Sequence, residues 1–165
     1  MPPVILAVED NAVTGQAIAR EFGQCGFEVH VAGSAESAFD LLESGLKCNV
    51  LILDFHLPTE QGPEFYRRLG MNPKYADIAI IPFTSQLEAS SSTSTDLTSQ
   101  YASSLQADQA GRTRSPIVSK GLTDELGQLP ASLYVAIAEQ LNNQGVQKPA
   151  KFTQRMIEAL REMNG

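Results

Sequence analysis

Residues 49–58 read Asn-Val-Leu-Ile-Leu-Asp-Phe-His-Leu-Pro, and this stretch decides the fold. Four consecutive branched apolar residues, Val50 to Leu53, lead directly into the carboxylate of Asp54. A continuous apolar run between polar residues is typical of a strand buried on both faces of a parallel sheet. Asp54 would then lie at the carboxyl end of that strand, where open α/β sheets bind their ligands. Taken alone, the same aspartate is explained equally well as the cap of the following turn.

Four other segments are predicted to form strands, at residues 4–8, 27–31, 78–83 and 115–119. Helices are predicted between them from apolar residues at 3.6-residue spacing, from Ser34 as an N-cap and from the proline after Gly62. Alternation of strands and helices predicts a doubly wound α/β domain, with a parallel sheet and right-handed crossovers.

The crossover between the fourth and fifth strands, residues 84–119, is long and rich in serine and threonine. Such a composition alone indicates a flexible linker. Leu97, Tyr101 and Leu105 nevertheless recur at every fourth position, which predicts a fourth helix over residues 96–110.

A fifth helix is predicted around Leu133 and Ile137, and an extra amphipathic helix lies within residues 146–165. One face of the extra helix carries its apolar residues, namely Phe152, Met156, Ala159, Leu160 and Met163. We expect this face to pack either on its own domain or on a second copy of the chain, so a homodimer remains open.

The composition disfavours two classes of binding partner, and the sequence indicates a location in the cell. A net charge of −7 with a pI of about 4.8 disfavours nucleic acids and anionic membranes as partners, because basic patches provide the affinity for both. The sequence has no signal-peptide pattern and no apolar run of transmembrane length. Cys25 and Cys48 lack metal or redox spacing, so we expect two reduced, mostly buried thiols in a cytoplasmic protein.

Polar residues follow the predicted strands where their carboxyl ends should meet. The first strand leads to Glu9 and Asp10, the third to Asp54, the fourth to Thr84 and the fifth to Lys120. Three converging carboxylates would repel one another, and a hard divalent cation such as Mg²⁺ would relieve that repulsion. With a hydroxyl and a mobile lysine charge beside a carboxylate nucleophile, the predicted site suits a phosphoryl group.

At this point the sequence resembles the receiver domains of two-component response regulators. The matching pieces are Val8-Glu9-Asp10-Asn11, residues 53–58 with Gly62 beyond them, Thr84 and Lys120, in that order. Each piece alone is weak, whereas five in register are specific. The resemblance covers residues 3–143 and implies a flavodoxin-like (βα)₅ fold with strand order 2-1-3-4-5.

The resemblance also implies roles for these residues. Asp54 would be the phosphoacceptor, taking its phosphoryl group from a histidine kinase or a histidine phosphotransfer protein. Mg²⁺ or Mn²⁺ would be bound by Asp10, Asp54 and the backbone carbonyl of His56, with Glu9 acting largely through water. Such a domain signals to a protein partner by conformational change and is not a turnover enzyme.

Two residues would contact the phosphoryl group, Thr84 through its hydroxyl and Lys120 through its charge.

The sequence departs from the family pattern in three places. The aromatic switch position is occupied by Ile117, the proline expected after the lysine is Gly121, and the crossover 84–119 is lengthened. A cis bond before a non-proline residue costs about 2.5–4 kcal/mol, so we expect a trans bond and a different loop there. Because an isoleucine cannot swing a ring, we expect the crossover to be the moving part.

Other functions remain open at this stage. The chain could be a receiver-like scaffold that is not phosphorylated, or the receiver fragment of a larger regulator. A phosphatase of the haloacid-dehalogenase kind is disfavoured, because it needs a second aspartate where this chain has His56.

Overall fold

The computed structural model describes residues 2–85, 115 and 117–164. Five parallel strands form one sheet in the order β2-β1-β3-β4-β5, as predicted. The strands are β1 Val4–Val8, β2 Glu28–Ala32, β3 Val50–Leu53, β4 Ala79–Thr84 and β5 Val118–Ser119. All four residues of β3 are buried, which confirms that its apolar run is covered on both faces.

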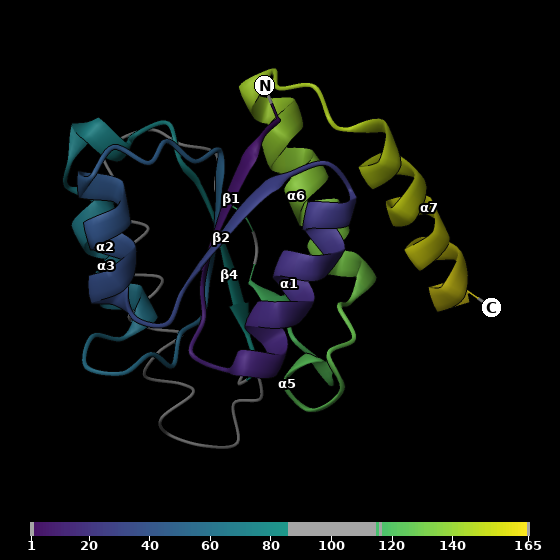
Figure 1. Cartoon of the computed structure of the whole chain (residues 1–165), viewed down its shortest axis with the longest axis horizontal. Coiled ribbons are helices and arrows are strands. Elements are labelled where there is room, and N and C mark those ends of the chain that lie inside the picture. Colours follow the sequence, from purple (N-terminus) through teal and green to yellow (C-terminus); the bar gives the residue numbers. More distant parts are fainter. Residues whose placement is uncertain (1, 86–114, 116, 165) are drawn as a thin grey trace.

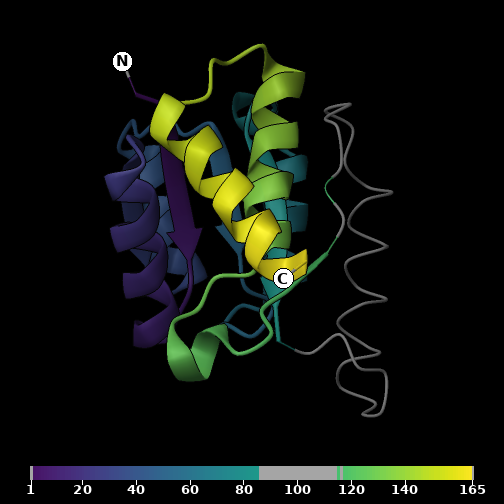
Figure 2. The ribbon, with the colours of Figure 1, turned by 90° about the vertical axis from the view of Figure 1, so that its right-hand side faces the viewer.

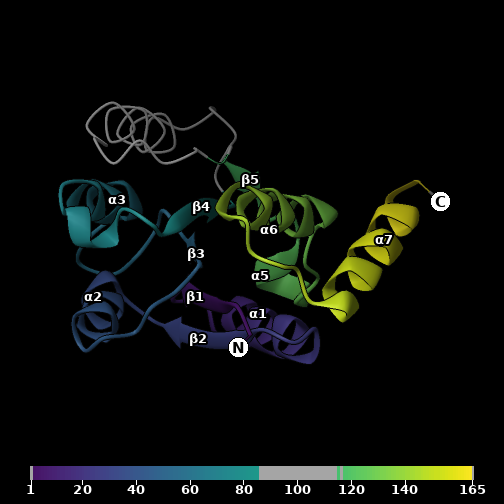
Figure 3. The same ribbon diagram turned by 90° about the horizontal axis from the view of Figure 1, so that it is seen from above.

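Helices cover both faces of the sheet, as Figures 1 and 3 show. One face carries α1 and α6, and the other carries α2 and α3. The helices are α1 Ala12–Gln24, α2 Ala35–Glu43, α3 Gly62–Gly70, α5 Thr123–Leu126, α6 Ala131–Gln144 and α7 Ala150–Asn164, with a 3₁₀ turn η1 at Pro73–Tyr75.

Local sequence explains where the helices begin. The side chain of Asn11 accepts the backbone N–H of Thr14 at the start of α1, and Ser34 accepts that of Ser37 at the start of α2. Proline occupies the first turn of α3, where its missing N–H costs nothing.

Two hydrophobic clusters form the core, one on each face of the sheet. Alternate residues of one strand enter different clusters, so that Ile52 packs beneath α1 and α6 while Leu51 and Leu53 pack beneath α2 and α3. Cys25 belongs to the cluster beneath α1 and α6, the first cluster, and Cys48 belongs to the second cluster, beneath α2 and α3. Both are free thiols, as predicted.

The helix α7 packs against the cluster beneath α1 and α6, and it crosses obliquely in front of α6 in Figure 2. Phe152 is fully buried among the rings of Phe22, Phe27 and Tyr134, with ring centroids 5.2–6.1 Å apart. Met163, at the other end of the helix, is 70% exposed. The predicted apolar face is therefore buried only over its first part.

The structure differs from the predicted elements in two places. The fifth strand is shorter than 115–119, since of the described residues 115 and 117–119 only Val118 and Ser119 pair with β4. The short helix α5, which the sequence did not predict, follows Gly121. Every peptide bond of the described residues is trans, including the bond before Gly121, as predicted. The predicted helix at 96–110 lies outside the described residues.

Within the described part of the chain, no helix combines the length and the apolar character needed to cross a membrane.

Candidate functional site

Backbone hydrogen bonds continue the sheet one residue beyond the strands and align the polar residues that follow. The N–H of Glu9 donates to Ala32 (2.8 Å), and the N–H of Asp54 donates to Val8 (3.0 Å). At the other side of the sheet, the N–H of Lys120 donates to the carbonyl of Thr84 (3.0 Å). The strand ends therefore form one row, as predicted.

The backbone of Asp54 is packed tightly against the start of α3. The N–H of Gly62 donates to the carbonyl of Phe55 (2.9 Å), which draws the two segments together. A Cβ at position 62 would lie 2.3 Å from the carbonyl oxygen of Asp54 and 2.8 Å from the Cα of Phe55. Only glycine fits at this close approach.

Three carboxylates meet at the row. Glu9, Asp10 and Asp54 each offer an oxygen, and these oxygens lie within 4.8 Å of one another. Glu9 and Asp54 are buried, whereas Asp10 is exposed and opens the cluster to solvent. The N–H of His56 donates to Oδ1 of Asp54 at 3.2 Å, which fixes the orientation of that carboxylate.

Lys120 lies inside the cluster and is 2% exposed, so its charge is not mobile as the sequence had suggested. Its Nζ donates to Glu9, to Oδ2 of Asp54 at 3.2 Å and to Oδ1 of Asp124 at 3.1 Å. Burial by itself would lower the pKa of Lys120, but Asp54 and Glu9 outweigh burial and raise the pKa. The lysine is therefore a fixed cation.

The buried side chain of Glu9 has a raised pKa and an oxygen without a hydrogen-bond partner among the described residues. Burial, reinforced by the neighbouring Asp54 carboxylate, raises the pKa of Glu9 to about 9 even though Lys120 opposes the shift. Its Oε2 is buried without a hydrogen-bond partner among the described residues. A buried carboxylate oxygen without a partner, beside two other carboxylates, fits a hard divalent cation bound through oxygen.

Asp124 is the site residue that sequence reasoning missed. It belongs to α5, and Figure 1 shows this short helix beside the start of α1. It accepts hydrogen bonds from Lys120 and from the hydroxyl of buried Thr14. The four-residue spacing of Lys120 and Asp124 was not a usable signal, because Lys120 lies before α5 and Gly121 between them has a positive φ of 57°, so the two residues do not share a helical turn.

The other predicted residues occupy the expected elements. Thr84 is fully buried at the end of β4, next to Lys120 along the sheet. Ile117 is partly buried and packs against the core cluster beneath α2 and α3. The ring Nε2 of His56 is buried without a hydrogen-bond partner in the described part of the chain.

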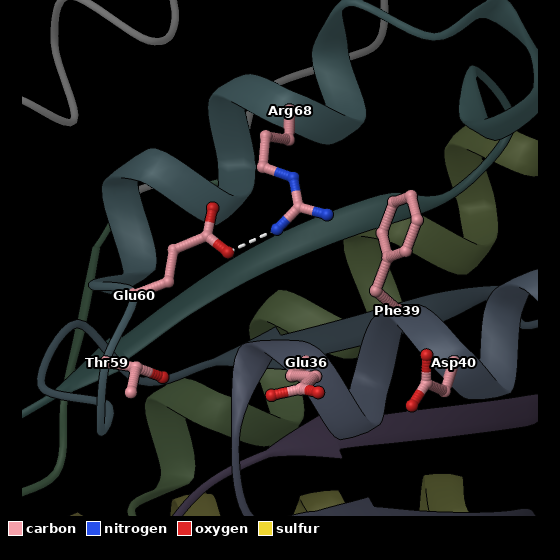
Figure 4. Close-up of a pocket in the computed structure, with 6 residues that line it drawn as sticks. All are labelled: Glu36, Phe39, Asp40, Thr59, Glu60 and Arg68. Carbon is pink, nitrogen blue, oxygen red and sulfur yellow. Dashed lines mark hydrogen bonds and ion pairs between the residues drawn. The ribbon is translucent and has the colours of Figure 1, made fainter.

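Apart from this cluster, a hollow of about 450 Å³ lies between α2, α3 and the loop after β3. Figure 4 shows its lining, in which Glu60 and Arg68 form an ion pair and the Arg68 guanidinium lies 4.4 Å from the ring centre of Phe39. Glu36 and Asp40 add negative charge, and none of the carboxylates bound to Lys120 lines this hollow.

Solved structures share this fold. The signal receiver domain of an HD domain-containing protein from Pseudomonas fluorescens Pf-5 is 21% identical, with a TM-score of 0.68 over 88% of this chain and 98% of that one. The Mn²⁺-bound form of response regulator Rcp1 is 18% identical, with a TM-score of 0.57 over 78% of this chain and 99% of that one.

Sequence comparisons agree with the fold. Two-component response regulator ORR11 of Oryza sativa, from both subspecies indica and japonica, is 28% identical over 85 residues, or 52% of this chain. The match spans 58% of the length of these relatives. The family model of the response regulator receiver domain matches residues 5–98, more than half of the chain. The chain therefore belongs to the response regulator receiver domain family.

Proposed function

We propose that this protein is a phosphoacceptor, in which Asp54 takes a phosphoryl group from a phosphohistidine donor. One observation carries the proposal: the Asp54 carboxylate, the buried Lys120 ammonium and the oxygens of Glu9 and Asp10 converge at the strand ends. A carboxylate nucleophile beside a fixed cation suits phosphoryl transfer, which depends on positioning and charge neutralisation.

In the proposed reaction, an oxygen of Asp54 bonds to phosphorus while the bond between phosphorus and the donor's imidazole nitrogen breaks. The electron pair of the broken bond stays on that nitrogen, and the product on Asp54 is an acyl phosphate. Lys120 would balance the phosphoryl charge, and the hydroxyl of Thr84 would donate a hydrogen bond to it. The His56 N–H would hold the attacking carboxylate in orientation.

Glu9, Asp10 and Asp54 would hold Mg²⁺ or Mn²⁺, with the backbone carbonyl of His56 as a further proposed ligand. The partnerless Oε2 of Glu9 supports this assignment, and so does the Mn²⁺-bound form of the related fold. When bound, the cation supplies positive charge to the phosphoryl oxygens.

The proposal implies partners and a location. The donor would be a histidine kinase or a histidine phosphotransfer protein, and the output a contact with another protein in the cytoplasm. A net charge of −7 argues against nucleic acid as the direct target. Residues 3–143 would form the receiver unit, with residues 146–165 as an appended helix that is also available for pairing two copies.

The test uses a small-molecule phosphodonor. The protein is incubated with acetyl phosphate and Mg²⁺ and its intact mass is measured over time, with Asp54→Asn as the control. The expected result is one added phosphoryl group that needs Mg²⁺ and is absent from the control.

Two other outcomes would overturn the proposal. Steady release of inorganic phosphate at many turnovers would indicate a phosphatase. A folded protein that gains no mass with this donor or with a phosphohistidine donor would indicate a scaffold.

A further inference from the structure

The ammonium of Lys120 makes one contact that the proposed phosphoryl chemistry does not require. Besides Glu9 and Asp54, it contacts both oxygens of Asp124, at 3.1 and 3.5 Å. Asp124 in turn accepts a hydrogen bond from the hydroxyl of Thr14, which is fully buried in α1. The carboxylate is thus anchored to a rigid helix and directed at the lysine.

These contacts use the full donor capacity of the lysine. An ammonium group has three N–H donors, and three carboxylates accept from this one. A phosphoryl oxygen can therefore bond to Lys120 only when one of the three contacts is weakened or released.

Asp124 is the contact that is easiest to release. The side chain of Glu9 is 3% exposed, so separating it from Lys120 would leave a buried charge without water. Asp54 itself would carry the phosphoryl group and stay beside the lysine. The side chain of Asp124 is 24% exposed and lies outside the cluster of Glu9, Asp10 and Asp54. Water can therefore replace the lysine at Asp124 at lower cost.

We propose that Asp124 is a positioning residue that holds Lys120 in the resting site and competes with the phosphoryl group for it. The inference rests on the proposed phosphoacceptor function. The contact between Lys120 and Asp124 would then stabilise the resting state relative to the phosphoryl-bound state. The stronger this contact is, the weaker phosphoryl binding should be. Thr14 sets that strength, because its hydroxyl keeps the carboxylate in place.

The experiment measures the affinity for beryllofluoride, a mimic of the phosphoryl group, by calorimetry at saturating Mg²⁺. Asp124→Asn keeps the size of the side chain and an oxygen that can accept from Thr14, and it removes the charge that holds Lys120. Its affinity for beryllofluoride is expected to rise about tenfold, the factor that one charge-assisted contact supplies. The affinity for Mg²⁺ alone should stay within about twofold, because Asp124 is outside the carboxylate cluster.

Glu125→Gln is the matched control. Glu125 is the next residue of α5, is exposed, and undergoes the same change of net charge. We expect it to leave both affinities unchanged. Thr14→Val, which removes the anchoring hydroxyl at nearly constant volume, should give a smaller rise than Asp124→Asn.

The outcomes separate this inference from the proposed function. If the wild-type protein binds beryllofluoride and Asp124→Asn does not differ from Glu125→Gln, Asp124 does not compete for Lys120 and the inference is wrong. A tighter Asp124→Asn complex with Mg²⁺ alone would instead attribute the effect to the metal cluster. A wild-type protein that binds no beryllofluoride would overturn the proposed function together with the inference.

Discussion

Gly62→Ala should damage both the stability of the fold and the position of the nucleophile. The added Cβ would lie 2.3 Å from the carbonyl oxygen of Asp54, and this oxygen would have to retreat by about 0.7 Å to reach the 3.0 Å below which such contacts are essentially never seen. Both of the nearest groups belong to the backbone, so neither can rotate away. Overpacking of this kind costs about 1–3 kcal/mol of unfolding free energy.

The variant should also react more slowly. A misplacement of about 1 Å can cost about a hundredfold in rate when the reacting groups must be aligned, so we expect at least a tenfold slower gain of mass from acetyl phosphate. Urea unfolding measures the loss of unfolding free energy. In a separate thermal scan, the melting temperature should fall by about 2–4 °C for each kcal/mol lost.

Gly23→Ala is the matched control for this variant. Gly23 lies in the exposed surface of α1, and a Cβ there meets no atom within 4 Å. The same substitution should stabilise the protein by about 0.4–1 kcal/mol, because alanine has less conformational freedom to lose in a helix. If Gly62→Ala is as stable and as reactive as Gly23→Ala, the close approach to Asp54 does not constrain the site.

Three further predictions concern the metal cluster, the buried cation and α7. Mg²⁺ should raise the melting temperature of the wild-type protein by mass action but not that of Asp10→Ala; equal shifts in both would argue against the carboxylate site. Lys120→Met should lower the unfolding free energy by about 3–5 kcal/mol without Mg²⁺, since it leaves buried carboxylates uncompensated, and a fully stable variant in urea unfolding would contradict this. Phe152→Ala should cost about 3–5 kcal/mol, because its ring is fully buried against α1 and α6; an unchanged urea midpoint would mean that α7 does not dock in solution.

The arrangement of the sheet could be predicted because it follows from local patterns and general topology. The apolar run Val50 to Leu53 indicates a strand covered on both faces, and parallel strands bring their carboxyl ends to one edge. The carboxylates of Glu9, Asp10 and Asp54 therefore meet at that edge.

The surroundings of Lys120 could not be predicted in the same way. Its burial depends on the conformation of the loop between β5 and α5, in which Gly121 has a positive φ of 57°. The contact between Asp124 and Thr14 joins residues 110 positions apart, through the unpredicted helix α5. Local periodicity carries no information about such a contact.

The extra helix shows a related limit. Its spacing predicted an apolar face, and Phe152 is buried as that face requires. Met163 has the same place in the pattern but is exposed, because it lies at an open hollow between α7, α6 and β5 and not against the core. Figure 3 shows α7 beside α6. A sequence pattern shows which side of a helix is apolar, but it does not show how much of that side the neighbouring elements cover.

The most direct measurement of the central claim is the location of the phosphoryl group on the chain. After reaction with acetyl phosphate and Mg²⁺, borohydride reduces an aspartyl phosphate to homoserine, and peptide mass spectrometry then locates the converted residue. We predict homoserine at position 54 alone, with none in a sample prepared without Mg²⁺. Homoserine at another aspartate, or an unconverted Asp54 in protein that has gained the mass of a phosphoryl group, would contradict the account.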